Sequence, residues 1–292
     1  MNTIQMKAYG KVNLGLDVLR RREDGYHEVR MIMQTVQLYD KITMEERHRE
    51  GIELETNLPF LPVNENNIAY RAARMLMEEF HIPGGLNIKI EKHIPVAAGM
   101  AGGSTDGAAV LYGVNQIYQL GLTKRQLMER GVRLGADVPY CIMRGTVLSE
   151  GIGEILTPVA SMPDCHILVA KPPISVSTKY VYEHLKLDSV KRRPDIDGMI
   201  KALEAGNLKG VADSMENVLE TVTIPEHPEI EAIKDVMRSG GALNAMMSGS
   251  GPTVFGIFDD EEKGMWTRDI LRNGTLAKQV YLVKPFNIRI HR

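Results

Sequence analysis

The sequence contains few cysteines and few aromatic residues. Its two cysteines, Cys141 and Cys165, form no CxxC pair and offer no disulfide framework, which is typical of a reducing cytosol, so we expect a cytoplasmic protein. Aromatic residues make up 5% of the chain and do not alternate with basic residues, which argues against a stacking surface for single-stranded nucleic acid. The eight histidines show no H-E-x-x-H or similar spacing, which argues against a structural zinc site.

The chain also lacks a large excess of charge and a long apolar run. A formal net charge of −2 gives no electrostatic reason to bind nucleic acid or an anionic membrane. No apolar run approaches the roughly 20 residues of a membrane-spanning helix, and the first residues do not form the apolar core of a signal peptide. We therefore expect neither a nucleic-acid partner nor a membrane partner.

Apolar periodicity predicts two successive sets of strands and helices within 292 residues. In the first set, strands are expected over 4–20, 26–43, 86–91 and 141–156, and helices over 64–80, 105–118 and 123–134. In the second set, strands are expected over 166–170, 244–258 (with a turn) and 280–290, and helices over 178–185, 197–205, 211–219, 229–238 and 261–272. We therefore predict an α+β protein of two domains, residues 1–158 and 159–292.

The most informative local feature is a glycine-rich connection between the predicted strand 86–91 and the helix that follows it. Gly99, Gly102 and Gly103 allow a ligand to approach the backbone closely, and Ser104 or Thr105 is placed to cap the first helical turn. A helix start presents unpaired N–H groups and a positive dipole end, which together suit a phosphate. The spacing matches neither a P-loop nor G-x-G-x-x-G, so a tight turn without a ligand is the alternative on this motif alone.

Four other sites carry candidate chemistry, each with a structural alternative. Lys11 lies in an apolar strand, where alternation predicts that it points to solvent, and Asp137 follows a predicted helix, where it could simply stabilise a turn. The turn at 24–27 brings Tyr26 and His27 together, although a buried histidine is the simpler reading. The loop at 248–253 could be a plain hairpin.

As a set, these stretches resemble the GHMP kinase superfamily, which is named for galactokinase, homoserine, mevalonate and phosphomevalonate kinases. The resemblance spans nearly the whole chain and is carried, in order, by Lys11-Val12-Asn13-Leu14, the 95–106 loop, Gly135-Ala136-Asp137-Val138-Pro139 and Ser248-Gly249-Ser250-Gly251-Pro252-Thr253. Asp24-Gly25-Tyr26-His27 narrows it to the branch that acts on a cytidine diphosphate-linked methylerythritol.

This resemblance implies a fold and a nucleotide site. The fold would be a GHMP kinase fold, with an N-terminal domain similar to ribosomal protein S5 domain 2 and a ferredoxin-like C-terminal domain. ATP and Mg²⁺ would be the cofactors, and the hydroxyl groups of Ser104 and Thr105 would reach phosphate or Mg²⁺, whose ligands are not otherwise identified. The ATP phosphates would bind the loop formed by Pro95, Ala97, Gly99, Met100, Ala101, Gly102, Gly103, Ser104 and Thr105. The family usually has glycine in place of Ala101 and serine in place of Thr105, and these are changes between small residues.

The resemblance also implies roles at the acceptor end. Asp137 would accept the proton of the substrate's 2-hydroxyl as general base, and Lys11 would keep that carboxylate ionised and stabilise developing negative charge. Tyr26 would stack on cytosine and His27 would hydrogen-bond its polar edge. The other expected substrate contacts are Asn13, Thr178, Tyr182 (with Tyr180 as the alternative) and Gly249.

The implied activity is a phosphoryl transfer in the non-mevalonate isoprenoid pathway, and three alternatives stay open. A homoserine or mevalonate kinase is disfavoured by Asp24–His27, because neither of those substrates has a base to stack. A non-catalytic ATP or sugar sensor would need neither Lys11 nor Asp137. An RNA-binding protein with an S5-like fold is disfavoured by the slightly acidic charge balance. A homodimer is compatible with the sequence.

Overall fold

The computed structural model describes residues 2–288 and divides the chain into two compact units that are each built from separate segments. The first unit contains the chain up to Gly10, Leu38–Val96 and Ala101–Met143, and the second contains Lys11–Gln37, Ala97–Met100 and the chain from Arg144 onward. Two long strands, β1 (Thr3–Arg21) and β2 (His27–Arg47), contribute residues to both units. The α+β class is confirmed, whereas a single boundary at residue 158 stays a prediction.

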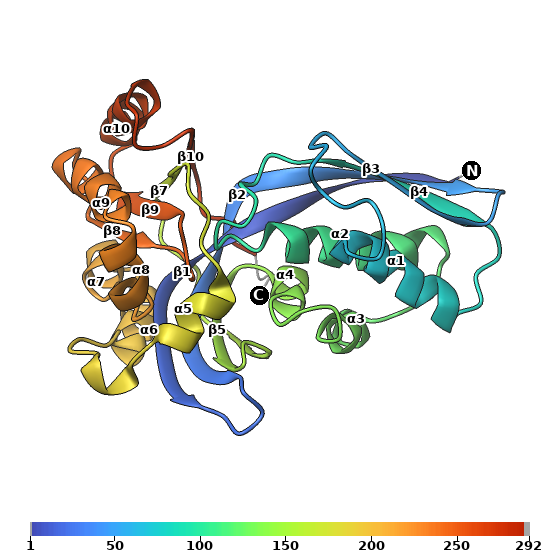
Figure 1. The fold of residues 1–292 in the computed structure, drawn as a ribbon, viewed down its shortest axis with the longest axis horizontal. Helices are drawn as coiled ribbons and strands as arrows, with labels where there is room; N and C mark the ends of the chain where they lie inside the picture. Colours follow the sequence, from blue (N-terminus) through green and yellow to red (C-terminus); the bar gives the residue numbers. More distant parts are fainter. Residues whose placement is uncertain (1, 289–292) are drawn as a thin grey trace. The chain divides into compact units, whose positions relative to one another are not determined.

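In the first unit, a small sheet carries a layer of helices on one face (Figure 1). β4 (Gly85–Glu91) runs antiparallel to the last part of β2, and β3 (Gly51–Thr56) runs parallel to β4. The helices are α1 (Ile68–Glu79), α2 (Gly102–Ile117), α3 (Lys124–Gly131) and α4 (Val138–Met143). α1 and α2 pack against each other, and a Cβ atom placed at Gly107 on α2 would lie 2.5 Å from Ile68 Cγ2 on α1, so a glycine there allows the two helices to approach closely.

One expectation for this part of the chain was wrong, and one strand was missed. β3 was not predicted at all, and residues 141–143, predicted as strand, form the end of α4. Pro139 stands in the first turn of α4, where a proline favours helix initiation. The apolar run that follows is too short for its periodicity to distinguish a buried helix from a strand.

The second unit contains two sets of paired strands. The first part of β2 pairs antiparallel with β5 (Thr146–Gly151), which pairs with β6 (Ile155–Pro158). The other set is an antiparallel sheet in the order β10-β7-β9-β8, formed by β7 (His166–Lys171), β8 (Asn244–Met247), β9 (Val254–Phe258) and β10 (Gln279–Val283). α9 (Glu229–Ser239) packs on β8 and β9, and α10 (Glu261–Asn273) packs on β7 and β10. Residues 289 and 290 of the last predicted strand lie outside the described residues.

Four shorter helices connect β7 to α9 in the second unit. They are α5 (Thr178–His184), α6 (Ile196–Glu204), α7 (Leu208–Asp213) and α8 (Glu220–Glu226). The predicted helix 211–219 is wrong beyond Asp213, and α8 was not predicted. The side chain of Asn217 accepts a bond from the Leu219 N–H at 3.0 Å, which offers the backbone an alternative to the helical ladder. Within residues 2–288, no helix combines the length and apolar character needed to cross a bilayer.

Candidate active site

Lys11 is buried rather than exposed to solvent. It lies on β1 with Asn13, and residues two apart on a strand share one face. Lys11 is only 5% exposed. Its Nζ donates to Asn13 Oδ1 at 2.6 Å and to the Gly99 carbonyl at 2.9 Å. Asn13 is 1% exposed and its amide lies 3.1 Å from Met31 Sδ. The expectation of a solvent-facing lysine is therefore wrong, and the ammonium group is held in a fixed position.

Gly99 brings the glycine-rich loop against the loop at 248–253. Its φ is +71°, and a Cβ atom placed there would lie 2.0 Å from the Ser248 carbonyl oxygen, so no other residue fits without moving the backbone. Ser248 Oγ donates to the Gly99 carbonyl at 3.0 Å, and the Lys11 backbone N–H donates to the Met100 carbonyl at 3.2 Å. We call Lys11, Asn13, Gly99 and Ser248 the Lys11 cluster. It assembles residues that lie far apart in the sequence.

The start of α2 differs from the predicted cap. Ala101, not Ser104 or Thr105, is the N-cap; it has φ 57° and no side-chain capping bond. Thr105 N–H makes the first helical bond, to the Ala101 carbonyl at 2.9 Å, and the N–H groups before it are those that a helix start leaves without intrahelical partners. Ser104 is partly exposed, whereas Thr105 is 2% exposed. Of the two hydroxyl groups, that of Ser104 is the better placed for a phosphate.

A buried ionic network beneath α2 was missed by the sequence reasoning. Lys92 Nζ bonds to a carboxylate oxygen of Asp40 and to Asp106 Oδ2, the latter at 2.7 Å, and all three residues are buried. Burial alone lowers the pKa of Lys92, but Asp106 and Asp40 outweigh it and raise that pKa, so the ammonium stays charged. Asp106 lies in the first turns of α2, so its bond to Lys92 holds the start of that helix in place. Asp106 is the one charged residue in α2, and this was the available sequence signal.

Asp137 belongs to the first unit. It lies in the turn before α4, is half-buried, and its carbonyl accepts a bond from Cys141 N–H at 3.0 Å. Lys11 belongs to the second unit, so the predicted pairing of Asp137 with Lys11 stays a prediction.

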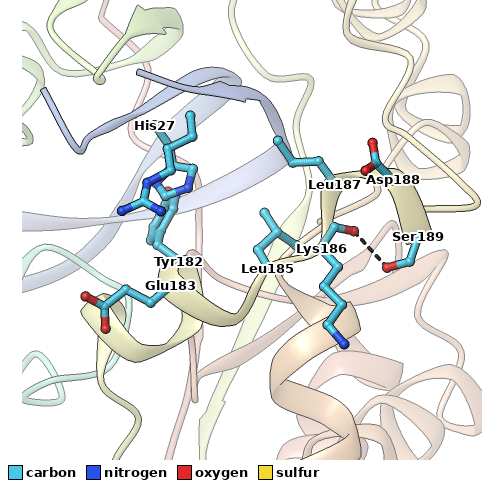
Figure 2. A pocket seen from close by; sticks show the side chains of 9 residues that line it. His27, Tyr182, Glu183, Leu185, Lys186, Leu187, Asp188 and Ser189 are labelled. Atoms are coloured by element: carbon cyan, nitrogen blue, oxygen red, sulfur yellow. Dashed lines mark hydrogen bonds between the residues drawn. The ribbon is translucent and has the colours of Figure 1, made fainter. Parts of the chain in front are cut away.

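A pocket of about 590 Å³ in the second unit contains His27 and Tyr182. Their ring centroids are 5.2 Å apart and their planes are inclined by 41° (Figure 2). The 186–189 turn lies across from them, closed by a 2.7 Å bond from Ser189 Oγ to the Lys186 carbonyl. Burial, together with the positive charge of Arg21, lowers the pKa of His27 below its ordinary value of 6.5, so the neutral imidazole is favoured. The pocket therefore offers an aromatic ring, a neutral imidazole and charged side chains of both signs, the basic Arg21 and Lys186 and the acidic Glu183 and Asp188.

The remaining predicted substrate residues have different surroundings. Tyr180 does not line this pocket; its ring stacks on His184 with a centroid distance of 3.8 Å, and its hydroxyl donates to Glu226 at 2.6 Å. Tyr26 lies in the turn between β1 and β2 and is 59% exposed. Thr178 begins α5, and its hydroxyl is 2.8 Å from that of Ser250. The structure thus brings Tyr182 to His27, and Thr178 to the 248–253 loop.

Comparison with known proteins assigns a family signature to both halves of the sequence. The family model described as GHMP kinases N terminal domain matches residues 67–145, and the model described as GHMP kinases C terminal matches residues 199–264. Two relatives named 4-diphosphocytidyl-2-C-methyl-D-erythritol kinase, from Lachnospira eligens and Lachnoclostridium phytofermentans, are each 54% identical over 286 residues. The alignments cover 98% of this chain and 99% and 98% of those relatives.

Solved structures give the same picture of the fold. A crystal structure of 4-(cytidine 5'-diphospho)-2C-methyl-D-erythritol kinase superposes with a TM-score of 0.83 at 30% identity, covering 97% of this chain and 99% of that one. Homoserine kinase from Cytophaga hutchinsonii superposes with a TM-score of 0.76 at 18% identity, covering 97% and 94%. The second likeness concerns the fold alone.

Proposed function

This chain belongs to the GHMP kinases, in the family of 4-diphosphocytidyl-2-C-methyl-D-erythritol kinases, and on that basis we propose that it transfers the γ-phosphoryl group of ATP to the 2-hydroxyl of 4-diphosphocytidyl-2-C-methyl-D-erythritol. The products are the 2-phosphate of that substrate and ADP. The reaction belongs to isoprenoid synthesis by the non-mevalonate route. The observation that carries the proposal is the pocket in which His27 and Tyr182 face each other, since a base needs both a π surface and a hydrogen-bonding edge.

The chemical step requires a base for the acceptor hydroxyl and positive charge near the transferred group. Asp137 accepts the proton of the 2-hydroxyl as the oxygen attacks the γ-phosphorus, and the bond to the bridging oxygen of ADP breaks. Lys11 stabilises the negative charge that develops, and its bonds to Asn13 and Gly99 hold the ammonium without reorganisation. Asn13 also orients the methylerythritol end.

The substrate's nucleotide half occupies the His27–Tyr182 pocket. Tyr182 stacks on the cytosine and His27 hydrogen-bonds its polar edge, while Tyr26, exposed at the turn, covers the base from the other side. Arg21 and Lys186 line the same pocket, beside the acidic Glu183 and Asp188, and these two basic side chains bind the diphosphate. Thr178 and Gly249 contribute from α5 and from the 248–253 loop.

ATP binds with its phosphates at the start of α2. The N–H groups of Gly102, Gly103 and Ser104 form the positive end of the helix dipole there. Among the described residues, no three His, Cys, Asp or Glu side chains gather as a metal cage. Mg²⁺ often binds through substrate phosphates and only one or two protein oxygens. The partly exposed Ser104 hydroxyl suits such a role, and Mg²⁺ supplies charge neutralisation on the phosphates when bound.

The test is ADP release from MgATP by the purified protein, with the cytidylyl methylerythritol, mevalonate and homoserine offered in parallel. We expect turnover with the first acceptor alone. Turnover only with mevalonate or homoserine would overturn the substrate assignment and the role given to His27 and Tyr182. ATP binding without turnover of any acceptor would instead support a sensor.

A further inference from the structure

Asn217 lies between α7 and α8 and is 1% exposed. Its Nδ2 donates to the carbonyls of Met247 at 2.9 Å and Gly249 at 2.8 Å, and its Oδ1 accepts from the Leu219 N–H at 3.0 Å. Both amide protons and the amide oxygen are therefore engaged. We call residues Ser248–Thr253 the Gly249 loop, and we call Met247, the residue before them, its anchor. The two bonds from Asn217 Nδ2 hold the anchor and the loop.

The backbone around Asn217 is also paired with β1. Leu16 N–H donates to the Glu216 carbonyl at 3.0 Å, and Val218 N–H donates to the Leu16 carbonyl at 3.1 Å. β1 is the strand that carries Lys11 and Asn13. Asn217 thus connects the strand of the Lys11 cluster to the Gly249 loop.

Glu220 supports the same anchor from the start of α8. Its Oε1 accepts from the Met247 N–H at 2.7 Å, and its Oε2 is 2.7 Å from Nζ of Lys234, which is 5% exposed. Both backbone polar groups of Met247 are therefore bound by side chains, which fixes the end of β8 where the Gly249 loop begins.

The opposite side of the Gly249 loop faces residues assigned to the reaction. Ser248 Oγ donates to the Gly99 carbonyl, which also accepts from Lys11 Nζ. Gly249 has φ +59°, and a Cβ atom there would come within 3.4 Å of Asn13 Oδ1. Ser250 Oγ meets the Thr178 hydroxyl at the start of α5, the helix that carries Tyr182. A shift of this loop would therefore reach both the Lys11 cluster and α5.

We propose that Asn217 is a positioning residue for the phosphoryl transfer. It holds the Gly249 loop so that Gly99 and Asn13 keep Lys11 in place, and it touches none of the reacting groups itself. This inference rests on the function proposed above. It adds a role for a residue outside both glycine-rich loops.

Asn217→Asp is the most direct variant, because it keeps the shape of the side chain and replaces two donors by an oxygen that faces two carbonyls. Asn244→Asp is the matched control, because Asn244 Nδ2 also donates to a backbone carbonyl, that of Ala212 at 2.8 Å, at the far end of β8. With kcat measured per folded molecule well below each melting temperature, we expect a loss of about tenfold to a hundredfold in Asn217→Asp, as for a small misplacement of catalytic groups. We expect Asn244→Asp to stay within about threefold.

A double-mutant cycle with Ser248→Ala separates positioning from general destabilisation. If Asn217 acts through the Gly249 loop, then Asn217→Asp should cost less in the Ser248→Ala background than in the wild type, because the bond to Gly99 is already missing. Additive losses, equal losses in Asn217→Asp and Asn244→Asp, or wild-type kcat in folded Asn217→Asp would each overturn the proposal.

Amide hydrogen exchange provides a readout that does not depend on turnover. We expect faster exchange at Ser248 and Gly251, whose N–H groups close the loop, in Asn217→Asp but not in Asn244→Asp. Unchanged exchange in Asn217→Asp would contradict the positioning role, whichever acceptor the wild type phosphorylates. Altered exchange in Asn217→Asp together with no turnover by the wild type would contradict the proposed function alone. If Asn217→Asp does not fold, Asn217→Ser, which removes the donors without adding charge, takes its place in all three measurements.

Discussion

The Lys11 cluster and the His27–Tyr182 pocket belong to the same unit and differ in construction. In the Lys11 cluster, Lys11 and Asn13 are at most 5% exposed, and Lys11 is held by hydrogen bonds to Asn13 and to the carbonyl of Gly99, which lies 88 residues away. The pocket is open, and the two rings in it meet by contact at 5.2 Å. A step that must stabilise charge requires groups fixed in advance, whereas a base must enter and leave. Losses in the first region should therefore appear in kcat and losses in the second in KM.

The largest expected effect comes from removing the ammonium of the Lys11 cluster. Lys11→Met keeps the length of the side chain and should lower kcat by about 10²–10³-fold, because the charge on the transferred group loses its stabilisation. Lys171→Met is a matched control: Lys171 Nζ also donates to backbone carbonyls, those of Pro172 and Ile174, in the same unit. The control should keep kcat within about threefold in a steady-state assay. If Lys11→Met raised KM and left kcat unchanged, the assignment of kcat to the Lys11 cluster and of KM to the pocket would be wrong.

The next effect concerns stacking in the pocket. Tyr182→Ala should raise KM for the cytidylyl substrate by about 5- to 150-fold, equivalent to 1–3 kcal/mol of stacking, with kcat nearly unchanged. Tyr180→Ala is the control, since Tyr180 stacks on His184 outside this pocket. If Tyr180→Ala raised KM and Tyr182→Ala did not, the base would lie elsewhere.

The smallest effect is a pH dependence carried by His27. Its pKa lies below 6.5 in the folded protein because burial and Arg21 disfavour the charged form. The neutral imidazole therefore prevails at pH 7, and protonation, which removes the ring's acceptor, sets in only in more acidic solution. KM should stay flat from pH 7 to 8 and rise only in solution more acidic than the ordinary histidine pKa of 6.5, and His27→Gln should lose this rise. A rise centred above pH 7 would contradict the assignment.

The sequence predicted the parts of the site that depend on local pattern. The strand, glycine-rich turn and helix around Gly99 follow from alternation and helical spacing, and the two α+β sets follow from the order of elements. Burial of Lys11 could not be predicted, because its acceptors come from Asn13 and from Gly99, which lies 88 residues away. The same holds for Lys92, whose partners are Asp40 and Asp106.

Two features could not be predicted from local sequence rules. They are the N-cap of α2 and which of Tyr180 and Tyr182 lies against His27. Ser104 and Thr105 satisfy the composition rule for a cap, yet Ala101 adopts a left-handed conformation and the helix begins earlier. Tyr180 and Tyr182 are two positions apart in the sequence, yet in the fold Tyr182 lies against His27 whereas Tyr180 stacks on His184. Tertiary contacts, not local propensity, decided both.

The most direct test of the central claim is the affinity of cytidine 5′-diphosphate, the nucleotide half of the proposed substrate, measured by calorimetry without ATP. Wild type and Lys11→Met should bind it with the same Kd, and Tyr182→Ala should bind it about 5- to 150-fold more weakly. Binding that is lost in Lys11→Met and kept in Tyr182→Ala would contradict the division between a cluster for chemistry and a pocket for the base.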